Sequence, residues 1–162
     1  MDTSDGELIA AFARHLRSER ARSPHTVRAY VRDVRGFAGH LADAGGSLSQ
    51  ARLADLRSWL GVLAGSGAAR ATVARRSAAL RTFYAWAHRQ GAVESDPALR
   101  LVAPKRARTL PPVLAAGDAS ALMQVAEQAA DDEGPLHLRN RAALELLYAT
   151  GIRVGELIGL DI

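Results

Sequence analysis

Apolar residues recur every three or four positions along most of this chain, which is the spacing of one face of an α-helix. The clearest stripe consists of Val27, Tyr30, Val31, Val34, Phe37 and Leu41. It follows Ser23-Pro24, a cap residue and a proline suited to the first helical position, and it ends at Gly45-Gly46. Runs that alternate apolar and polar residues, as in strands, do not occur. The pattern predicts an all-α chain.

Four helices are predicted in the first part of the chain, over residues 4–20, 24–41, 53–64 and 71–89. Ser4 and Glu7 have the spacing of a capping box at the start of the first helix. The third and fourth helices present apolar faces made of Leu56, Trp59, Leu60 and Leu63, and of Val73, Leu80, Phe83, Tyr84 and Ala87. We expect residues 1–91 to form one helical domain.

The character of the sequence changes after residue 91. Residues 92–112 hold four prolines, three arginines and one lysine without sustained periodicity, which predicts a basic, partly extended linker. Further helices are predicted over 118–130, 136–150 and 154–160. Because two or three helices do not easily bury their apolar faces alone, we expect residues 113–162 to be the incomplete start of a second domain and the chain to be a fragment.

The net charge also differs between the first and the second part of the chain. Residues 1–108 carry 18 Lys and Arg against 9 Asp and Glu, a net charge of +9, whereas residues 109–162 carry 3 against 8, a net charge of −5. A front segment with this excess fits a polyanionic partner, most simply nucleic acid. A basic surface that is merely solvated is the alternative.

Arginines lie on one side of two predicted helices. Arg28, Arg32 and Arg35 are spaced i, i+4 and i+7, on a face roughly 100° from the apolar stripe of their helix. On the fourth helix Arg75 lies opposite Leu80. Such helices fit the major groove of DNA, where arginines bind phosphates or guanine edges. Any amphipathic helix also needs a polar outer face, so plain solvent exposure remains the other interpretation.

Other function classes lack sequence support. The five histidines show no metal-ligand spacing, the chain has no cysteine, and no glycine-rich phosphate loop occurs. No apolar run approaches the roughly 18 residues that span a bilayer. The polar start MDTSDGEL does not have the pattern of a secretory signal. We expect no metal, no cofactor and no membrane partner, and a cytoplasmic location.

Arg153 is the main candidate for chemistry. It follows Gly151 at a break between two apolar helical segments, and Glu156 lies three residues further on, close enough to pair with it. A guanidinium is a planar, always-charged fork that binds two phosphate oxygens at once. A structural ion pair at a helix junction is the competing interpretation.

Four segments together resemble the tyrosine recombinases, especially the bacterial Xer type. The segment LRNRAALELLYATGIRVGELIGLDI is similar to the family's first catalytic-arginine segment. SPHTVRAYVRDVRGF and RRSAALRTFYAWAHRQGAVESDPA are similar to two helices of its core-binding domain, and APKRARTLP is similar to its interdomain linker. Nearly all of residues 7–162 is covered in the family's order.

The resemblance implies a four-helix SAM-like core-binding domain that clamps DNA, followed by the first helices of a mixed α+β catalytic domain. It implies that Arg153 binds the scissile phosphate and that Glu156 supports it. The resemblance and the arginine faces of the two helices together select the candidates for DNA contact. These are Arg28, Arg32, Arg75, Arg76, Arg81, Lys105 and Arg106. The implied partners are a double-stranded recombination site and a related recombinase subunit in a tetrameric synapse, acting in chromosome dimer resolution and cell division.

In the family a tyrosine attacks a phosphodiester and forms a 3′-phosphotyrosyl link without a metal. No tyrosine here matches that nucleophile, so we expect the 162-residue chain to be inactive by itself. Two alternatives remain open. One is a phage or transposon integrase of the same superfamily, and the other is a helical DNA-binding protein without chemistry.

Overall fold

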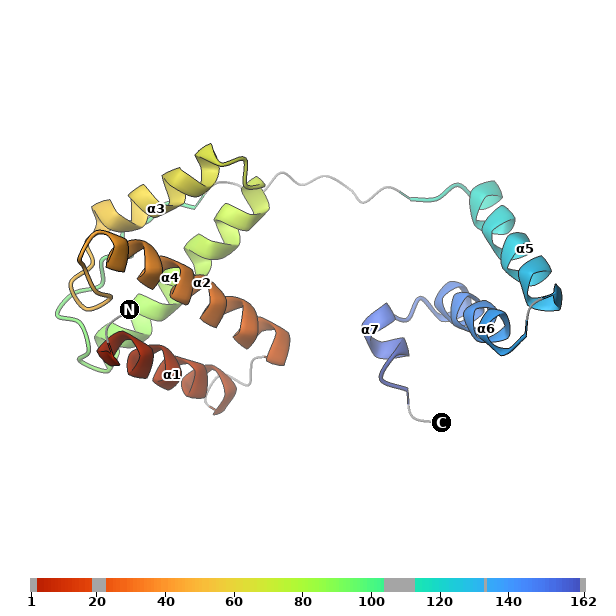
Figure 1. The fold of residues 1–162 in the computed structure, drawn as a ribbon, viewed down its shortest axis with the longest axis horizontal. Helices are drawn as coiled ribbons and strands as arrows, with labels where there is room; N and C mark the ends of the chain where they lie inside the picture. The colour runs from red at the N-terminus through yellow and green to blue at the C-terminus, as the bar shows by residue number, and fades with distance from the viewer. Residues whose placement is uncertain (1–2, 19–22, 104–112, 133, 161–162) are drawn as a thin grey trace. The chain divides into compact units, whose positions relative to one another are not determined.

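The computed structural model describes residues 3–18, 23–103, 113–132 and 134–160, and all regular secondary structure in these ranges is helical (Figure 1). In chain order the helices are α1 (Thr3–Ser18), α2 (Pro24–Asp43), α3 (Leu53–Gly65), α4 (Arg70–Arg89), α5 (Ala116–Asp132), α6 (Pro135–Thr150) and α7 (Val154–Leu157). The chain divides into two compact units, Met1–Arg108 with α1–α4 and Thr109–Ile162 with α5–α7. The all-α prediction is confirmed for the described residues.

Helix α2 begins where its sequence indicated. Ser23 Oγ caps the helix by accepting a hydrogen bond from Thr26 N at 3.3 Å, and Pro24 occupies the first turn. The helix ends in a turn in which Gly46 N donates to the carbonyl oxygen of Leu41 at 2.8 Å. Local chemistry therefore sets both ends of the helix that carries the first arginine row.

Helix α1 does not begin with the capping box that we expected from Ser4 and Glu7. The helix begins at Thr3, so Ser4 lies inside the first turn and does not cap it. Asp5 is only 2% exposed, and its two carboxylate oxygens accept from Leu48 N at 3.1 and 3.3 Å. The hydroxyl of Tyr84 donates to the carbonyl oxygen of Leu48 at 3.1 Å. These bonds fasten the α2–α3 loop to α1 and α4.

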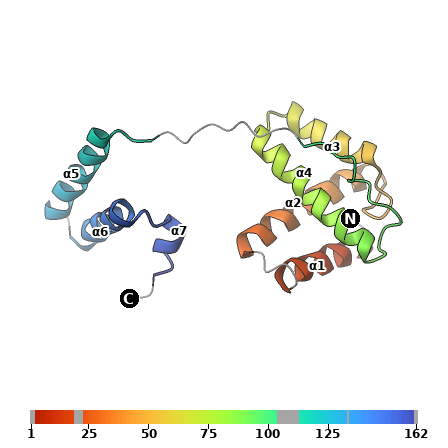
Figure 2. The ribbon, with the colours of Figure 1, turned by 180° about the vertical axis from the view of Figure 1, so that it is seen from behind.

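Aromatic side chains dominate the core of the first unit. Phe12 of α1, Phe37 of α2 and Phe83 of α4 are fully buried, and the rings of Phe12 and Phe83 meet edge to face at 5.2 Å between centroids. Helix α4 packs against each of the other three helices (Figures 1 and 2). The apolar positions predicted on α3 and α4 are buried there, except Leu63, which is partly buried.

The segment after α4 belongs to the first unit for at least ten residues. Val93, Ala98 and Leu101 are buried in the same core as the helices. Asp96 Oδ1 accepts a hydrogen bond from Ala98 N at 2.7 Å, which shapes the turn there. The linker that we expected to start at residue 92 therefore begins as a packed extension, because its apolar side chains complete the core.

Helices α5 and α6 pack against each other in the second unit. Arg141 of α6 bridges to Glu127 of α5 at 3.2 Å and to Glu145 at 2.9 Å. Helix α6 ends at Gly151, whose φ of 65° is in the left-handed region that favours glycine. Helix α7 ends at Leu157, three residues before its predicted end. No described residue of α6 or α7 is buried, so this unit has only a small core.

Candidate nucleic-acid interface and phosphate site

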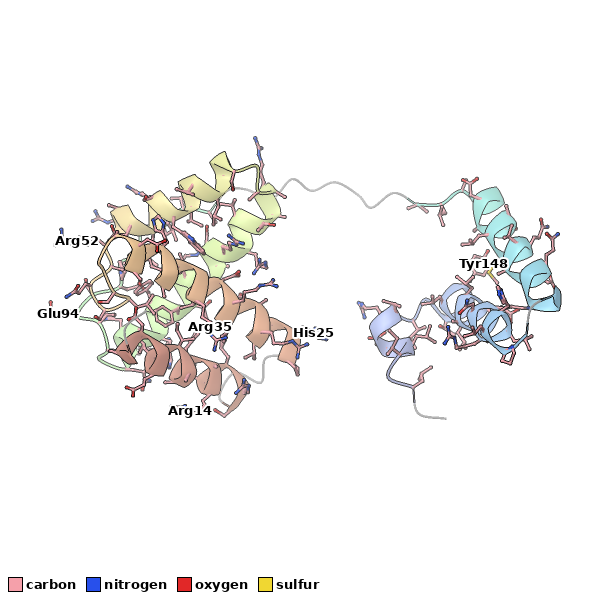
Figure 3. The ribbon with its side chains drawn as sticks, viewed as in Figure 1. Arg14, His25, Arg35, Arg52, Glu94 and Tyr148 are labelled. Atoms are coloured by element: carbon pink, nitrogen blue, oxygen red, sulfur yellow. The ribbon has the colours of Figure 1, made fainter. Side chains whose placement is uncertain are left out.

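The predicted arginine row of α2 lies on the surface of the first unit. Arg28, Arg32 and Arg35 are all exposed, while Val27 and Val34 of the same helix are buried. Arg28 Nη2 lies 2.9 Å from His25 Nδ1 at the start of the helix. Figure 3 labels His25 and Arg35 on this helix. The amphipathic pattern thus gives α2 a buried face and a cationic face.

The predicted arginines of α4 differ in exposure. Arg81 is exposed, whereas the side chains of Arg75 and Arg76 are only 29% and 28% exposed. Arg75 Nη1 donates to Asp33 Oδ2 of α2, and Arg76 Nε lies 3.7 Å from Asp33 Oδ1. One carboxylate therefore ties two of the candidate DNA contacts to the neighbouring helix.

The environment of Asp33 accounts for this arrangement. The residue is 2% exposed, and burial raises the pKa of its carboxyl above the usual 3.8, against the opposing attraction of Arg75, Arg76 and Arg32. The guanidinium carbon of Arg76 also lies 5.5 Å from the ring centroid of Trp59, in cation–π contact. Guanidinium groups held in this way lose little further freedom when they bind a phosphate.

Helical spacing placed Arg75 opposite Leu80, and Arg76 was named as a further DNA-contact candidate, but Asp33 was missed. A signal was available, because Asp33 precedes Phe37 by one helical turn and so lies at the edge of the buried stripe of α2. A carboxylate at such a position needs a cationic partner.

Lys105 and Arg106, the two candidates for DNA contact in the predicted linker, lie outside the described residues.

Arg153 lies at the start of α7, directly after the α6–α7 turn. Its backbone N donates to Glu156 Oε2 at 3.0 Å, and its Nη1 lies 3.3 Å from Glu156 Oε1. Thr150 Oγ1 accepts from Ile152 N at 3.2 Å, which fixes the turn before it. The Arg153 side chain is 85% exposed, so most of its N–H donors face solvent. The guanidinium is tethered but open to an incoming anion.

The exposure of this pair bears on the two interpretations of Arg153. An ion pair between exposed side chains stabilises a fold by about 0–1 kcal/mol. The Glu156 side chain is itself 56% exposed, so the pair belongs to that class. A purely structural role gives a small benefit here, whereas a tethered guanidinium with open donors suits binding of a phosphate.

The first unit also has a cleft of about 940 Å³ between the α2–α3 loop and the segment after α4. Its lining includes Arg52, Asp55 and Glu94, so it carries charges of both signs. Asp55 Oδ2 already accepts from Arg52 N at 2.8 Å. Two carboxylates in the wall disfavour a phosphate, and we do not assign the cleft to nucleic acid.

Two other kinds of site find no support in the part of the chain that the structure describes. None of its helices combines the length and the apolar character that crossing a bilayer requires. Its histidine, aspartate and glutamate side chains do not form any group of three that could hold a metal ion.

The α2 and α4 arginines belong to the first compact unit and Arg153 to the second.

Comparisons with known proteins cover both units. Residues 9–91 match the family described as Phage integrase, N-terminal SAM-like domain, and residues 112–162 match the Phage integrase family. Tyrosine recombinase XerC of Mycobacterium tuberculosis is 50% identical over 155 residues, which cover 96% of this chain and 52% of that protein. Tyrosine recombinase XerC of Mycobacterium leprae is 48% identical over 155 residues, with the same coverage. The chain spans about half the length of the curated relatives that it matches.

Two solved structures share the fold. A lambda integrase dimer bound to a COC' core site matches with a TM-score of 0.69 and 22% identity, covering 94% of this chain and 40% of that one. An integrase from mycobacterium phage Brujita matches with a TM-score of 0.58 and 21% identity, covering 95% and 48%. The predicted helical, SAM-like fold of the first unit is confirmed.

Proposed function

Because this chain belongs to the phage integrase family, the tyrosine recombinases, we propose that it serves site-specific DNA recombination of the Xer type. Its first unit binds the double-stranded recombination site, and Arg153 of its second unit binds the phosphate that is cut. Identity of 50% to a tyrosine recombinase XerC, against 21–22% to the two integrase structures, favours the Xer type over a phage or transposon integrase. The proposed activity is that of a whole recombinase.

The observation that carries the catalytic part is the open, tethered guanidinium of Arg153. In phosphoryl transfer, negative charge grows on the non-bridging oxygens as the transition state forms, and donors already in place stabilise it most. Glu156 accepts from the backbone N of Arg153 and pairs with its side chain, so it acts as a positioning residue. Lysine keeps the charge at this position but loses the two-pronged geometry.

The binding part rests on the charge and the faces of α2 and α4. We assign DNA contact to Arg28, Arg32, Arg75, Arg76 and Arg81, and to Lys105 and Arg106 of the predicted linker. Contacts from arginine to phosphate release counterions from the duplex, so affinity falls with salt. The lambda integrase neighbour is a dimer on its core site, which supports a second recombinase subunit as a partner. We extend that to a tetrameric synapse that resolves chromosome dimers.

A chimera tests the catalytic assignment. Residues 1–162 replace the matching part of the M. tuberculosis XerC, and cleavage of a suicide substrate for that enzyme is measured with Arg153 and with Arg153→Lys. We expect the lysine variant to cleave about 10²–10³-fold more slowly, as when one oxyanion donor is lost, while both chimeras bind the site equally.

Two results would contradict the assignment. One is equal cleavage by the chimera that retains Arg153 and the chimera that carries Arg153→Lys. The other is a chimera with intact Arg153 that binds the site but never cleaves it, under conditions in which the M. tuberculosis enzyme does. A chain that only binds DNA, the third interpretation, would give that second result.

A further inference from the structure

A groove between α1 and α2 gathers five arginines from two helices. Its volume is about 550 Å³, and its lining includes Arg14 and Arg17 of α1 with Arg28, Arg32 and Arg35 of α2. All five side chains are exposed. Figure 3 labels Arg14 on α1 and Arg35 on α2. The α1 pair was not among the residues expected to contact DNA.

The groove is built from the helical spacing of both elements. Arg14 and Arg17 are three residues apart and so share one side of α1. Ile9 and Val27 line the same groove, and both are almost fully buried, at 1% and 2% exposure. Tight packing of α1 on α2 therefore brings the two arginine rows to the same groove.

The positive charge in this groove is not balanced by the described side chains. No carboxylate lines the groove, and no ion pair joins a described carboxylate to any of the five guanidinium groups. Asp33, the neighbour of Arg32, is buried and bonded to Arg75 of α4 instead. Like charges so close together repel each other, and a bound polyanion relieves that repulsion.

The length of the groove indicates the class of polyanion. The α2 row from Arg28 to Arg35 extends over about 10 Å at 1.5 Å per residue, which exceeds the size of one phosphate group. A run of guanidinium groups on two walls suits a ladder of phosphates, each held by a planar fork. We propose that the α1–α2 groove binds the phosphodiester backbone of DNA through Arg14 and Arg17 together with the α2 row. This inference rests on the proposed DNA-binding function and extends it to α1.

The test uses the full 162-residue chain and a long DNA duplex. Affinity is measured between 50 and 200 mM salt for the wild type and for Arg14→Gln/Arg17→Gln. Each phosphate contact contributes about 0.9 to the slope of log affinity against log salt. The variant should therefore lose about 1.8 from the slope, and the ratio of the two affinities should change about 12-fold over this range. Arg14→Lys/Arg17→Lys should retain the wild-type slope because it retains the charge.

The matched control is Arg52→Gln/Arg57→Gln. It removes the same charge from exposed positions at the start of α3 and within it that do not line the groove, and its slope should stay close to the wild-type value. An equal loss of slope in the control would overturn the proposal, because any surface charge would then have the same effect. An unchanged slope in Arg14→Gln/Arg17→Gln, beside a salt-dependent wild type, would overturn it while leaving the proposed function intact and would favour an acidic protein partner. Absence of salt-dependent binding by the wild type would refute the proposed function itself.

Discussion

Replacing Asp33 by alanine tests how the first unit holds the arginines of α4. The change removes a carboxylate that is 2% exposed, bonds to Arg75 and lies 3.7 Å from Arg76 Nε. Two guanidinium groups, with side chains 29% and 28% exposed, lose their shared acceptor. The packing of α2 against α4 thereby loses both of the ion pairs that join these helices among the described residues.

The size of the effect follows from this partial burial. Removing one partner of a fully buried ion pair costs about 3–5 kcal/mol. Here both arginines already reach solvent, and the cost of burying the carboxylate disappears with it. We therefore expect Asp33→Ala to lower the free energy of unfolding by about 1.5–3 kcal/mol. For a unit of this size, each kcal/mol shifts Tm by about 4–8 °C.

Tryptophan fluorescence during urea unfolding is the assay. The chain has two tryptophans, and Trp59 and Trp86 are both buried in the first unit, so the signal reports on that unit alone. A double-mutant cycle with Arg75→Ala should give a coupling energy of about 1–2 kcal/mol. The same cycle with Arg57→Ala, an exposed arginine of α3, should give none. A cost for Asp33→Ala below about 0.5 kcal/mol, or additivity with Arg75→Ala, would refute the reasoning.

Three further predictions concern single groups. Because burial raises the pKa of Asp33, the folded state binds its proton more tightly than the unfolded state. The wild type should then lose unfolding free energy relative to Asp33→Asn as pH rises from about 4 through the raised pKa, and a pH-independent difference in urea unfolding would contradict this. Tyr84→Phe leaves the buried carbonyl of Leu48 without its donor and should cost about 1–2 kcal/mol in the same fluorescence assay; no measurable loss would show that water replaces the hydroxyl. Gly151→Ala forces alanine to a φ of 65° in open space and should destabilise the α6–α7 turn by about 1 kcal/mol. Gly155→Ala, at a helical position without a positive φ, should not; amide hydrogen exchange compares the two, and equal protection would contradict the prediction.

Much of the fold could be predicted from the sequence because helix formation here is local. The apolar period of 3.6 residues, Ser23-Pro24 and the glycine turns are properties of short segments, and they predicted helices within a few residues of those observed. The turn that presents Arg153 was also predictable, because glycine at residue 151 and Glu156 three residues after the arginine act within one turn. The resemblance of the segments to tyrosine recombinases is confirmed by the family matches.

The contacts between helices were decided only by the tertiary structure. Helical spacing showed which side of α2 faces inward, but it did not show that Asp33 meets Arg75, 42 residues away. The same holds for Asp5, which fastens the loop at Leu48, and for Arg14, which α1 brings to the arginine row of α2. Such pairings depend on how helices cross and how deeply each side chain is buried. Those quantities come from packing of the whole unit and are not properties of any one segment of the sequence.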